Sequence, residues 1–246
     1  MESKKVYLSL VIPSYNESKI LLKNIEKALS YLSAKGYIFE IIVVDDGSTD
    51  NTKDLITAVS KAHSNIKPIF NIQNMGKGFS VKSGVLAAEG QYILFSDADF
   101  STPIEEMEKL VPHFTRGFDV VIGSRAMKNS KIVLKQAWFR QGMGKAFNRL
   151  ARVLGLADIN DTQCGFKCFS GNAAKKIFKL QRLRGFCFDV EVLSIAKRLG
   201  YKVREEPVVW VNRADSRVRI VRDSSAMFFD LLRIRLNILL GHYNAR

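Results

Sequence analysis

The first half of the sequence alternates between short apolar runs rich in Val, Ile and Leu and longer segments with helical spacing. Apolar runs begin at residues 6, 39, 66, 91 and 119, and the helical segments between them cover residues 20–36, 51–64, 77–90 and 101–114. Such alternation, with strands that are apolar on both faces, is typical of a mainly parallel sheet covered by helices on both sides. The sequence therefore predicts an α/β fold.

The second half of the sequence is less regular. It predicts helices over residues 137–155, 171–180 and 188–200, a strand over 201–211, and a loop or short strand over 160–170. The last helix is almost entirely apolar, with Asp230, Arg233 and Asn237 as one polar stripe. Because no linker is long enough to separate two large domains, we expect one domain over residues 1–222 and an amphipathic helix over residues 223–246.

Charge is distributed unevenly along the 246 residues, of which 47% are hydrophobic. Residues 1–124 hold 13 Lys or Arg and 15 Asp or Glu, a net charge of −2, whereas residues 125–246 hold 25 and 9, a net charge of +16. A basic half indicates an anionic partner, and nucleic acid, an acidic membrane surface and a phosphorylated substrate all fit. A basic surface that serves only solubility fits as well.

The three cysteines, Cys164, Cys168 and Cys187, match no zinc-binding spacing and have no histidine nearby in the sequence. They are typical of reduced thiols in a cytosolic compartment. The first residues lack the apolar stretch of a signal peptide, and no uninterrupted run of about 18 apolar residues occurs. We therefore expect a cytoplasmic protein without a transmembrane helix.

Polar motifs follow four of the predicted strands. "PSYNE" follows the first strand, "DDGSTD" the second, "DAD" the fourth and "GSR" the fifth. In an open parallel sheet, ligands bind beyond the carboxyl ends of the strands, so these motifs are predicted to line one crevice. Their carboxylates, amides, hydroxyls and arginine suit a phosphate-bearing ligand with a metal. The sequence contains neither a G-x-G-x-x-G nor a P-loop pattern, which argues against dinucleotide and P-loop folds.

Two carboxylates separated by one residue, Asp97 and Asp99, end the fourth predicted strand. In an extended segment, residues i and i+2 point the same way, which places both carboxylates on one side. This arrangement suits a hard cation such as Mg²⁺ or Mn²⁺, which takes oxygen ligands and completes its shell with substrate phosphates. Helix capping or turn formation by Asp99 is the alternative interpretation.

Together these motifs resemble those of inverting family 2 glycosyltransferases. The first-half motifs are "VIPSYNE" at residues 11–17, "VVDDGSTDNT" at 43–52, "NMGKG" at 74–78, "DADFSTP" at 97–103 and "VIGSR" at 121–125. "DTQCGFKCFS" at 161–170 and the basic segment from residue 216 narrow the resemblance to dolichyl-phosphate β-glucosyltransferases and their prokaryotic polyprenyl-phosphate relatives. The resemblance covers nearly the whole chain and implies a GT-A (Rossmann-like) fold.

The resemblance implies a role for each matched residue. Asp99 would hold the Mg²⁺ or Mn²⁺ that bridges the donor diphosphate, and Arg125 would face the donor or acceptor phosphates, because arginine suits bidentate phosphate recognition. Two arginines of a basic loop would close over the donor. The implied catalytic residues are Asp99, Asp161 and Arg125. The implied nucleotide-sugar contacts are Pro13, Tyr15, Glu17, Val44, Asp46, Lys77, Asp97, Ala98, Asp99, Arg125, Arg213 and Arg217.

The resemblance also implies the reaction and the donor. An acceptor phosphate oxygen would attack the anomeric carbon in one in-line displacement, a reaction that relies on positioning and electrostatic stabilisation. A polyprenyl phosphate is already an anion and hardly needs a base. Asp161 is the candidate for sugar binding or general base, with a turn-forming Asp as the alternative. Mannosyl-transferring relatives carry glutamine where this chain has Ser101, which disfavours GDP-mannose and favours UDP-glucose.

The C-terminal helix indicates which acceptor to expect. A wide apolar face with arginines at its margin suits a helix that lies on an anionic bilayer, here the cytoplasmic face of a membrane. A helix that packs on the core, or that pairs two copies in a homodimer, is the alternative. We therefore expect a polyprenyl (dolichyl-type) phosphate as acceptor and a peripheral membrane location.

Two other functions compete with this expectation. The first keeps the fold but transfers the sugar to a glycan or a protein, which requires a base for the acceptor hydroxyl. The second is a nucleic-acid or anionic-membrane binding module without catalysis, suggested by the basic half. Because the sequence shows no RNP-like or helix-turn-helix-like signature, we expect no nucleic-acid partner.

Overall fold

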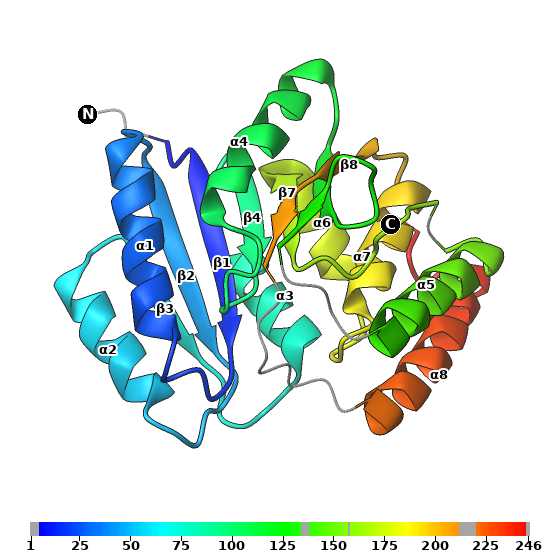
Figure 1. Cartoon of the computed structure of the whole chain (residues 1–246), viewed down its shortest axis with the longest axis horizontal. Helices are drawn as coiled ribbons and strands as arrows, with labels where there is room; N and C mark the ends of the chain where they lie inside the picture. Colours follow the sequence, from blue (N-terminus) through cyan, green and yellow to red (C-terminus); the bar gives the residue numbers. More distant parts are fainter. Residues whose placement is uncertain (1–4, 134–137, 157, 212–219, 245–246) are drawn as a thin grey trace.

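A seven-stranded sheet forms the centre of the computed structural model, which describes residues 5–133, 138–156, 158–211 and 220–244 (Figure 1). The strand order is β3-β2-β1-β4-β7-β5-β8. The strands are β1 (Leu8–Ser14), β2 (Phe39–Asp45), β3 (Ile66–Phe70), β4 (Tyr92–Ser96), β5 (Val120–Ser124), β7 (Phe166–Ser170) and β8 (Val203–Pro207). Two short strands, β6 (Lys131–Ile132) and β9 (Val209–Trp210), form a separate parallel pair.

The first half of the sheet is parallel, as the sequence predicts. Strand β1 pairs with β2 on one side and with β4 on the other, both in parallel register. All seven residues of β1 are buried, because helices cover both faces. Successive connections run in opposite directions from β1, which opens a crevice beyond its carboxyl end, where ligands bind in such sheets.

Strand β7 is the exception, since it runs antiparallel to both of its neighbours, β4 and β5. The sequence predicted only a loop or a short strand here. The strand fits the middle of the sheet because Phe166, Cys168 and Phe169 are buried on both of its faces. Its first residues therefore lie at the same edge as the last residues of β4, where the Asp97 N–H donates to the Gly165 carbonyl over 3.1 Å.

Helices form a layer on each face of the sheet. One face carries α1 (Leu21–Ala34), α2 (Thr52–Ala62) and α4 (Met107–Leu110), and the other carries α3 (Lys77–Ala87), α6 (Gly171–Leu180) and α7 (Phe188–Arg198). The helix predicted over 101–114 is instead a short α4 between the 3₁₀ turns Ile104–Glu106 and Val111–Arg116. Pro112 lacks the N–H that a continuous helix needs.

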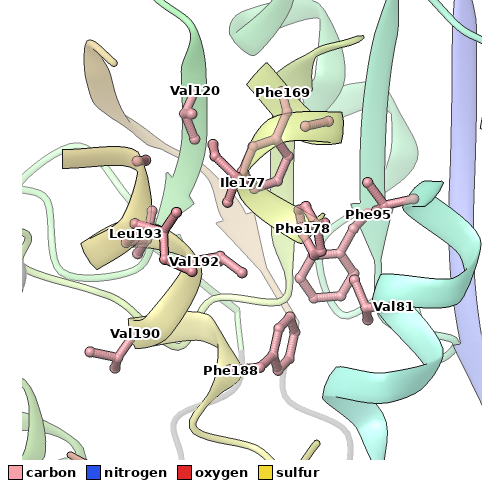
Figure 2. Close-up of a cluster of buried hydrophobic side chains, with 14 of the residues drawn as sticks. Val81, Phe95, Val120, Phe169, Ile177, Phe178, Phe188, Val190, Val192 and Leu193 are labelled. Carbon is pink, nitrogen blue, oxygen red and sulfur yellow. The ribbon is translucent and has the colours of Figure 1, made fainter. Parts of the chain in front are cut away.

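Aromatic side chains fix α6 and α7 onto the sheet. Phe95 of β4 lies with its ring centroid 5.7 Å from that of Phe188 at the start of α7 (Figure 2). Phe169 of β7 meets Phe178 of α6 edge to face, with centroids 5.3 Å apart. All four rings are fully buried, and burying a side chain of this size contributes about 1.5–3 kcal/mol each.

Helices α5 (Trp138–Val153) and α8 (Ile220–Leu239) lie at the same end of the molecule, away from α1 and α2 (Figure 1). Leu231 and Ile234 of α8 belong to the same buried cluster as the sheet and α7. Asn237, one residue of the predicted polar stripe of this helix, is buried, and its amide donates to the Tyr243 hydroxyl over 2.9 Å. Within the described ranges, no helix is long and apolar enough to span a membrane.

Candidate active site

Four strand ends meet at one edge of the sheet, as the sequence predicts. Strands β1, β2 and β4 are parallel, and β4 and β5 point the same way because both run opposite to β7. Pro13 and Val44 face each other in the β1–β2 register and are buried inside the sheet. Ala98 is also buried, and its carbonyl accepts from Asn24 of α1 over 2.7 Å. The predicted site residues at and beyond these strand ends that the structure describes therefore lie at the same edge of the sheet.

The loops after β1 and β2 are tied to each other. Asn16 has a positive φ of 54°, which asparagine tolerates, and its side-chain oxygen accepts from the backbone of Thr49 over 2.7 Å. The Glu17 N–H donates to the Thr52 hydroxyl over 2.8 Å. Tyr15 and Glu17 are half-buried at this edge. These contacts place the two predicted nucleotide-binding loops side by side.

Asp46 organises the loop that precedes Lys77. Its carboxylate accepts from the Met75 N–H over 3.0 Å, from the Gly76 N–H over 2.8 Å and from the Asn71 amide over 2.8 Å. A carboxylate that accepts several protein donors is held in one orientation. The structure therefore brings Asp46 to the site as a support for the Lys77 loop.

Lys77 and Asp97 form an ion pair just beyond the end of strand β4. The Nζ of Lys77 lies 2.7 Å from Oδ1 of Asp97, and both side chains are partly exposed. Burial alone would lower the pKa of Lys77, but the carboxylates of Asp97 and Asp189 raise it above the ordinary value. Lys77 is therefore a fixed positive charge at this edge of the sheet.

A second ion pair lies directly behind the first. Lys167 of β7 and Asp189 of α7 are both buried and pair with each other, and Lys167 also donates to the Cys164 carbonyl over 2.6 Å. Lys77 and Lys167 each lie 5.5 Å from the centroid of the Phe95 ring. Sequence reasoning missed this pair, although a lysine inside the apolar stretch "CGFKCF" is a signal of a buried, paired charge.

The sequence suggested that Asp97 and Asp99 share one side of an extended strand. The structure does not have this arrangement. Strand β4 ends at Ser96, and the chain turns so that the Phe100 N–H donates to the Asp97 carbonyl over 3.1 Å. Phe100 has a φ of 47°, a strained value for a bulky side chain, and such strain concentrates at functional sites. Asp99 instead contacts Ser101, whose N–H and hydroxyl donate to its two carboxylate oxygens over 2.8 and 2.9 Å.

Arg125 and Asp161 form a third ion pair. The Nε and Nη2 of Arg125 donate to the two Asp161 oxygens over 2.7 and 2.8 Å. The guanidinium also lies 5.4 Å from the Trp210 ring centroid. Burial would raise the pKa of the Asp161 carboxyl, but Arg125 holds it below the ordinary value.

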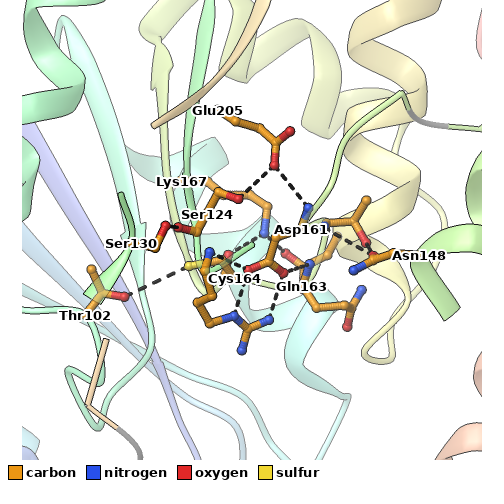
Figure 3. A network of polar contacts seen from close by, with 12 residues as sticks. Thr102, Ser124, Ser130, Asn148, Asp161, Gln163, Cys164, Lys167 and Glu205 are labelled. Atoms are coloured by element: carbon orange, nitrogen blue, oxygen red, sulfur yellow. Dashed lines mark hydrogen bonds and ion pairs between the residues drawn. The ribbon is translucent and has the colours of Figure 1, made fainter. Parts of the chain in front are cut away.

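Glu205 of β8 forms hydrogen bonds that hold the Asp161 side of the Arg125–Asp161 pair in place. It accepts from the Asp161 N–H over 3.0 Å and from the Ser124 hydroxyl over 2.9 Å (Figure 3). The remaining oxygen accepts from the Asn160 backbone over 2.9 Å. Sequence reasoning missed Glu205, which the pairing of β8 with β5 brings beside Ser124, and Trp210, which lies in the separate strand β9. Arg213 and Arg217, the predicted loop arginines, lie outside the described residues.

Comparison with known protein families shows which family the chain belongs to. Residues 9–177 match the family profile described as Glycosyl transferase family 2, which is more than half of the chain. The chain belongs to glycosyl transferase family 2. The predicted family and the predicted glycosyltransferase activity are therefore confirmed.

Curated relatives of this family 2 member are similar over nearly its whole length. The dolichyl-phosphate beta-glucosyltransferase of Saccharomyces cerevisiae is 38% identical over 260 residues, which covers 98% of this chain and 78% of the yeast protein. The dolichyl-phosphate beta-glucosyltransferase of Homo sapiens is 33% identical and covers 98% of this chain and 78% of the human protein. These identities support the narrower resemblance seen in the second-half motifs.

Solved structures show the same GT-A fold. The glucosyl-3-phosphoglycerate synthase of Mycobacterium tuberculosis, crystallised with Mn²⁺, UDP and phosphoglyceric acid, superposes with a TM-score of 0.66 at 21% identity and covers 99% of this chain and 80% of the synthase. The mannosyl-3-phosphoglycerate synthase of Rubrobacter xylanophilus has a TM-score of 0.68 at 17% identity, with coverages of 98% and 76%. The predicted fold class is confirmed.

A divalent cation fits this family 2 site through a carboxylate together with ligands from water and substrate phosphates. The residues that the structure describes contain no cluster of three or more His, Cys, Asp or Glu that would hold a metal by itself. Mg²⁺ often binds through one or two carboxylates and takes its other ligands from water and substrate phosphates. Asp99 suits this mode, because Ser101 orients both of its oxygens while the carboxylate stays partly exposed.

Proposed function

We propose that this glycosyltransferase transfers glucose from UDP-glucose to a dolichyl-type polyprenyl phosphate, with inversion at the anomeric carbon. The observation that carries the proposal is the 38% identity, over 98% of this chain, to a dolichyl-phosphate beta-glucosyltransferase. The basic second half is consistent with a phosphate-bearing acceptor. Ser101, in place of the glutamine of mannosyl-transferring relatives, supports a donor other than GDP-mannose.

The proposed roles build on the Lys77–Asp97 and Arg125–Asp161 ion pairs. Tyr15 and Glu17 border the nucleoside together with Asp97, and Lys77 faces the donor diphosphate. Asp99 would hold Mg²⁺ or Mn²⁺, which would supply positive charge to the leaving diphosphate. We assign Arg125 to the acceptor phosphate, because its guanidinium is fixed by Asp161 and lies against Trp210. Arg213 and Arg217 are proposed to add positive charge over the donor.

The ion pair between Arg125 and Asp161 fixes the position of Arg125. It also leaves Asp161 unsuited to act as a general base. Both oxygens of Asp161 accept from Arg125, and a carboxylate with a lowered pKa is a weak base. An ionised lipid phosphate attacks without losing a proton in the transition state. We therefore propose that Asp161 acts by orienting Arg125.

Asp161→Asn tests this assignment. We expect the KM for the lipid phosphate to rise by about tenfold to 100-fold, since one bond of a charged pair is lost, while the pH dependence of kcat keeps its shape. If Asp161 were the general base, the acidic limb of the pH–rate profile would disappear and kcat would fall far more than KM rises. Asp158→Asn, at an exposed carboxylate three positions earlier in the chain, is the matched control.

The outer face of α8 is proposed to lie on the membrane. Its buried face packs on α7, yet its opposite side exposes six large apolar side chains: Phe228, Phe229, Leu232, Leu236, Leu239 and Leu240. Arg233 and Arg235 are exposed between them and suit anionic headgroups. The three free cysteines are consistent with action at the cytoplasmic face.

Exchanging two of these side chains for serine tests the membrane contact. Phe229 and Leu236 are 68% and 54% exposed, so their replacement leaves the core intact. We expect Phe229→Ser/Leu236→Ser to bind phosphatidylcholine–phosphatidylserine vesicles about 10-fold to 100-fold more weakly in a sedimentation assay, because buried apolar area is lost. Ile38→Ser, at an exposed apolar side chain directly before β2, should bind as the unchanged chain does. Equal binding by both variants would exclude α8 as the contact.

A donor and acceptor screen tests the function itself. The purified chain is incubated with UDP-glucose, other UDP-sugars or GDP-mannose, each with dolichyl phosphate and Mn²⁺, and lipid-linked sugar is measured by mass spectrometry. We expect glucosyl-phospholipid from UDP-glucose and none from GDP-mannose. Transfer to a glycan or protein acceptor, with no lipid-linked product, would replace the proposal by the broader family 2 activity.

A further inference from the structure

The segment between α6 and α7, residues 181–185, forms the surface on which the start of α3 rests. A Cβ on Gly76 would lie 2.5 Å from the Arg184 carbonyl oxygen, and a Cβ on Gly78 would lie 2.8 Å from that of Leu183. The Phe79 N–H donates to the same Arg184 carbonyl over 3.2 Å. The two residues that flank Lys77 are therefore in direct contact with this segment.

Gln181 joins the two segments from inside. Its side-chain amide is buried and donates to the Gly78 carbonyl over 2.9 Å and to the Leu183 carbonyl over 2.8 Å. The backbone of 181–185 and the first turn of α3 thus share one set of hydrogen bonds. Displacing residues 182–184 would move the backbone on which the Lys77 side chain stands.

Glu191 of α7 holds the segment in place. Its fully buried carboxylate accepts from the Arg182 N–H over 3.0 Å and from the Leu183 N–H over 2.8 Å. A buried carboxylate is stable only where donors compensate its lost hydration, and here both oxygens receive backbone donors. The position of residues 182–183 is therefore set by one side chain.

Tyr243, beyond the end of α8, completes this arrangement. Its buried hydroxyl donates to Oε1 of Glu191 over 2.6 Å and accepts from the Asn237 amide over 2.9 Å. His242 contacts the Asn237 side-chain oxygen over 3.0 Å. The C-terminal turn thus fixes the orientation of Glu191, 52 residues earlier in the chain.

We propose that Glu191 and Tyr243 are positioning residues for Lys77. The contacts run from the Tyr243 hydroxyl to Glu191, then to the backbone of 182–184, then to Gly76 and Gly78, and they end at the Lys77–Asp97 ion pair. The inference rests on the proposed role of Lys77 at the donor diphosphate. It assigns to the C-terminal turn an effect on nucleotide binding, although this turn contributes no side chain to the crevice.

Tyr243→Phe tests the proposal, because it removes the hydroxyl and keeps the ring. In the absence of any ligand, we expect the backbone amides of residues 76–80 to exchange with deuterium faster than in the unchanged chain. We expect the dissociation constant for UDP with Mn²⁺ to rise about threefold to tenfold, the range that follows from one lost buried hydrogen bond. The KM for the nucleotide sugar should rise similarly, and kcat should stay within about twofold.

Asn244→Ala is the matched control on the same turn. It removes the contact from Arg198 to the Asn244 side chain, which lies outside the Glu191 arrangement, and should leave exchange at 76–80 and UDP binding unchanged. Glu191→Gln is the second variant, which keeps the volume and places an amide against two backbone donors. We expect it to weaken UDP binding more than Tyr243→Phe does.

Three results would overturn the inference. The first is that Tyr243→Phe lowers the melting temperature but leaves both exchange at 76–80 and UDP binding unchanged, which would make the contact purely structural. The second is an equal effect of Asn244→Ala. The third is that the unchanged chain binds no UDP, which removes the role of Lys77. A failure to glucosylate dolichyl phosphate, with UDP binding and its dependence on Tyr243 intact, would instead count only against the proposed acceptor.

Discussion

Asp99→Asn is expected to lower kcat/KM for sugar transfer by about 10³-fold, because a cation at a developing charge supplies several kcal/mol of stabilisation. The substitution keeps the size of the side chain and the acceptor oxygen that Ser101 can bond, so the turn should be kept. Only the negative charge that would hold Mg²⁺ or Mn²⁺ is lost. Steady-state transfer assays with saturating lipid phosphate measure the effect.

UDP binding separates a loss of the cation from a loss of the fold. In the unchanged chain, Mn²⁺ should strengthen UDP binding in calorimetry, whereas in Asp99→Asn the affinity should be the same with and without Mn²⁺. Asp54→Asn, at an exposed carboxylate in the first turn of α2, should behave as the unchanged chain does. If Asp99→Asn keeps a Mn²⁺-dependent affinity for UDP, another residue holds the cation.

Gly165→Ala is expected to raise the KM for the nucleotide sugar by about 100-fold or more, through Asp97. A Cβ on Gly165 would lie 2.0 Å from Oδ2 of Asp97 and 2.3 Å from its Cγ, far inside van der Waals contact. The Asp97 side chain must therefore leave its place beside Lys77, and a misplacement of about 1 Å at such a site can cost 10²-fold in rate. Kinetic assays over a range of UDP-glucose concentrations measure the change.

A double-mutant cycle shows whether the effect passes through Asp97. Asp97→Ala alone should be about as impaired as Gly165→Ala, and the double variant should be no worse than either, since contacting residues are not additive. Gly144→Ala is the matched control, because nothing lies within 4 Å of its Cβ position in α5. Additive losses in the double variant would place the effect of Gly165 elsewhere in the fold.

The parallel half of the sheet could be predicted because its signals are local. Each strand from β1 to β4 is a short apolar run bounded by a helix, and the rule that ligands bind beyond strand ends then groups "PSYNE", "DDGSTD" and "DAD". The resemblance to family 2 glycosyltransferases then implied roles for Asp46, Lys77 and Arg125 through their motifs. These residues lie within a few positions of a strand or helix end, so their placement follows from the sheet alone.

The rest of the site depends on contacts that no periodicity encodes. The direction of β7 follows from its two neighbours, and only that direction places Gly165 against Asp97. Pairing of Arg125 with Asp161 requires the loop before β7 to return to the end of β5. The extended geometry expected for Asp97 and Asp99 failed because β4 ends at Ser96 and the chain turns between Asp97 and Phe100, and the sequence pattern does not reveal this turn.

The reversed strand β7 also has a consequence for how proteins of this architecture can diversify. The chain leaves the sheet after Ser124 and re-enters it at Phe166, at the same edge. Residues 125–165 therefore form an insertion whose two ends are adjacent, and such a segment can be lengthened or replaced without shifting the register of β1, β2 and β4. The parallel half of the sheet can thus be retained while the neighbouring segment is exchanged for another.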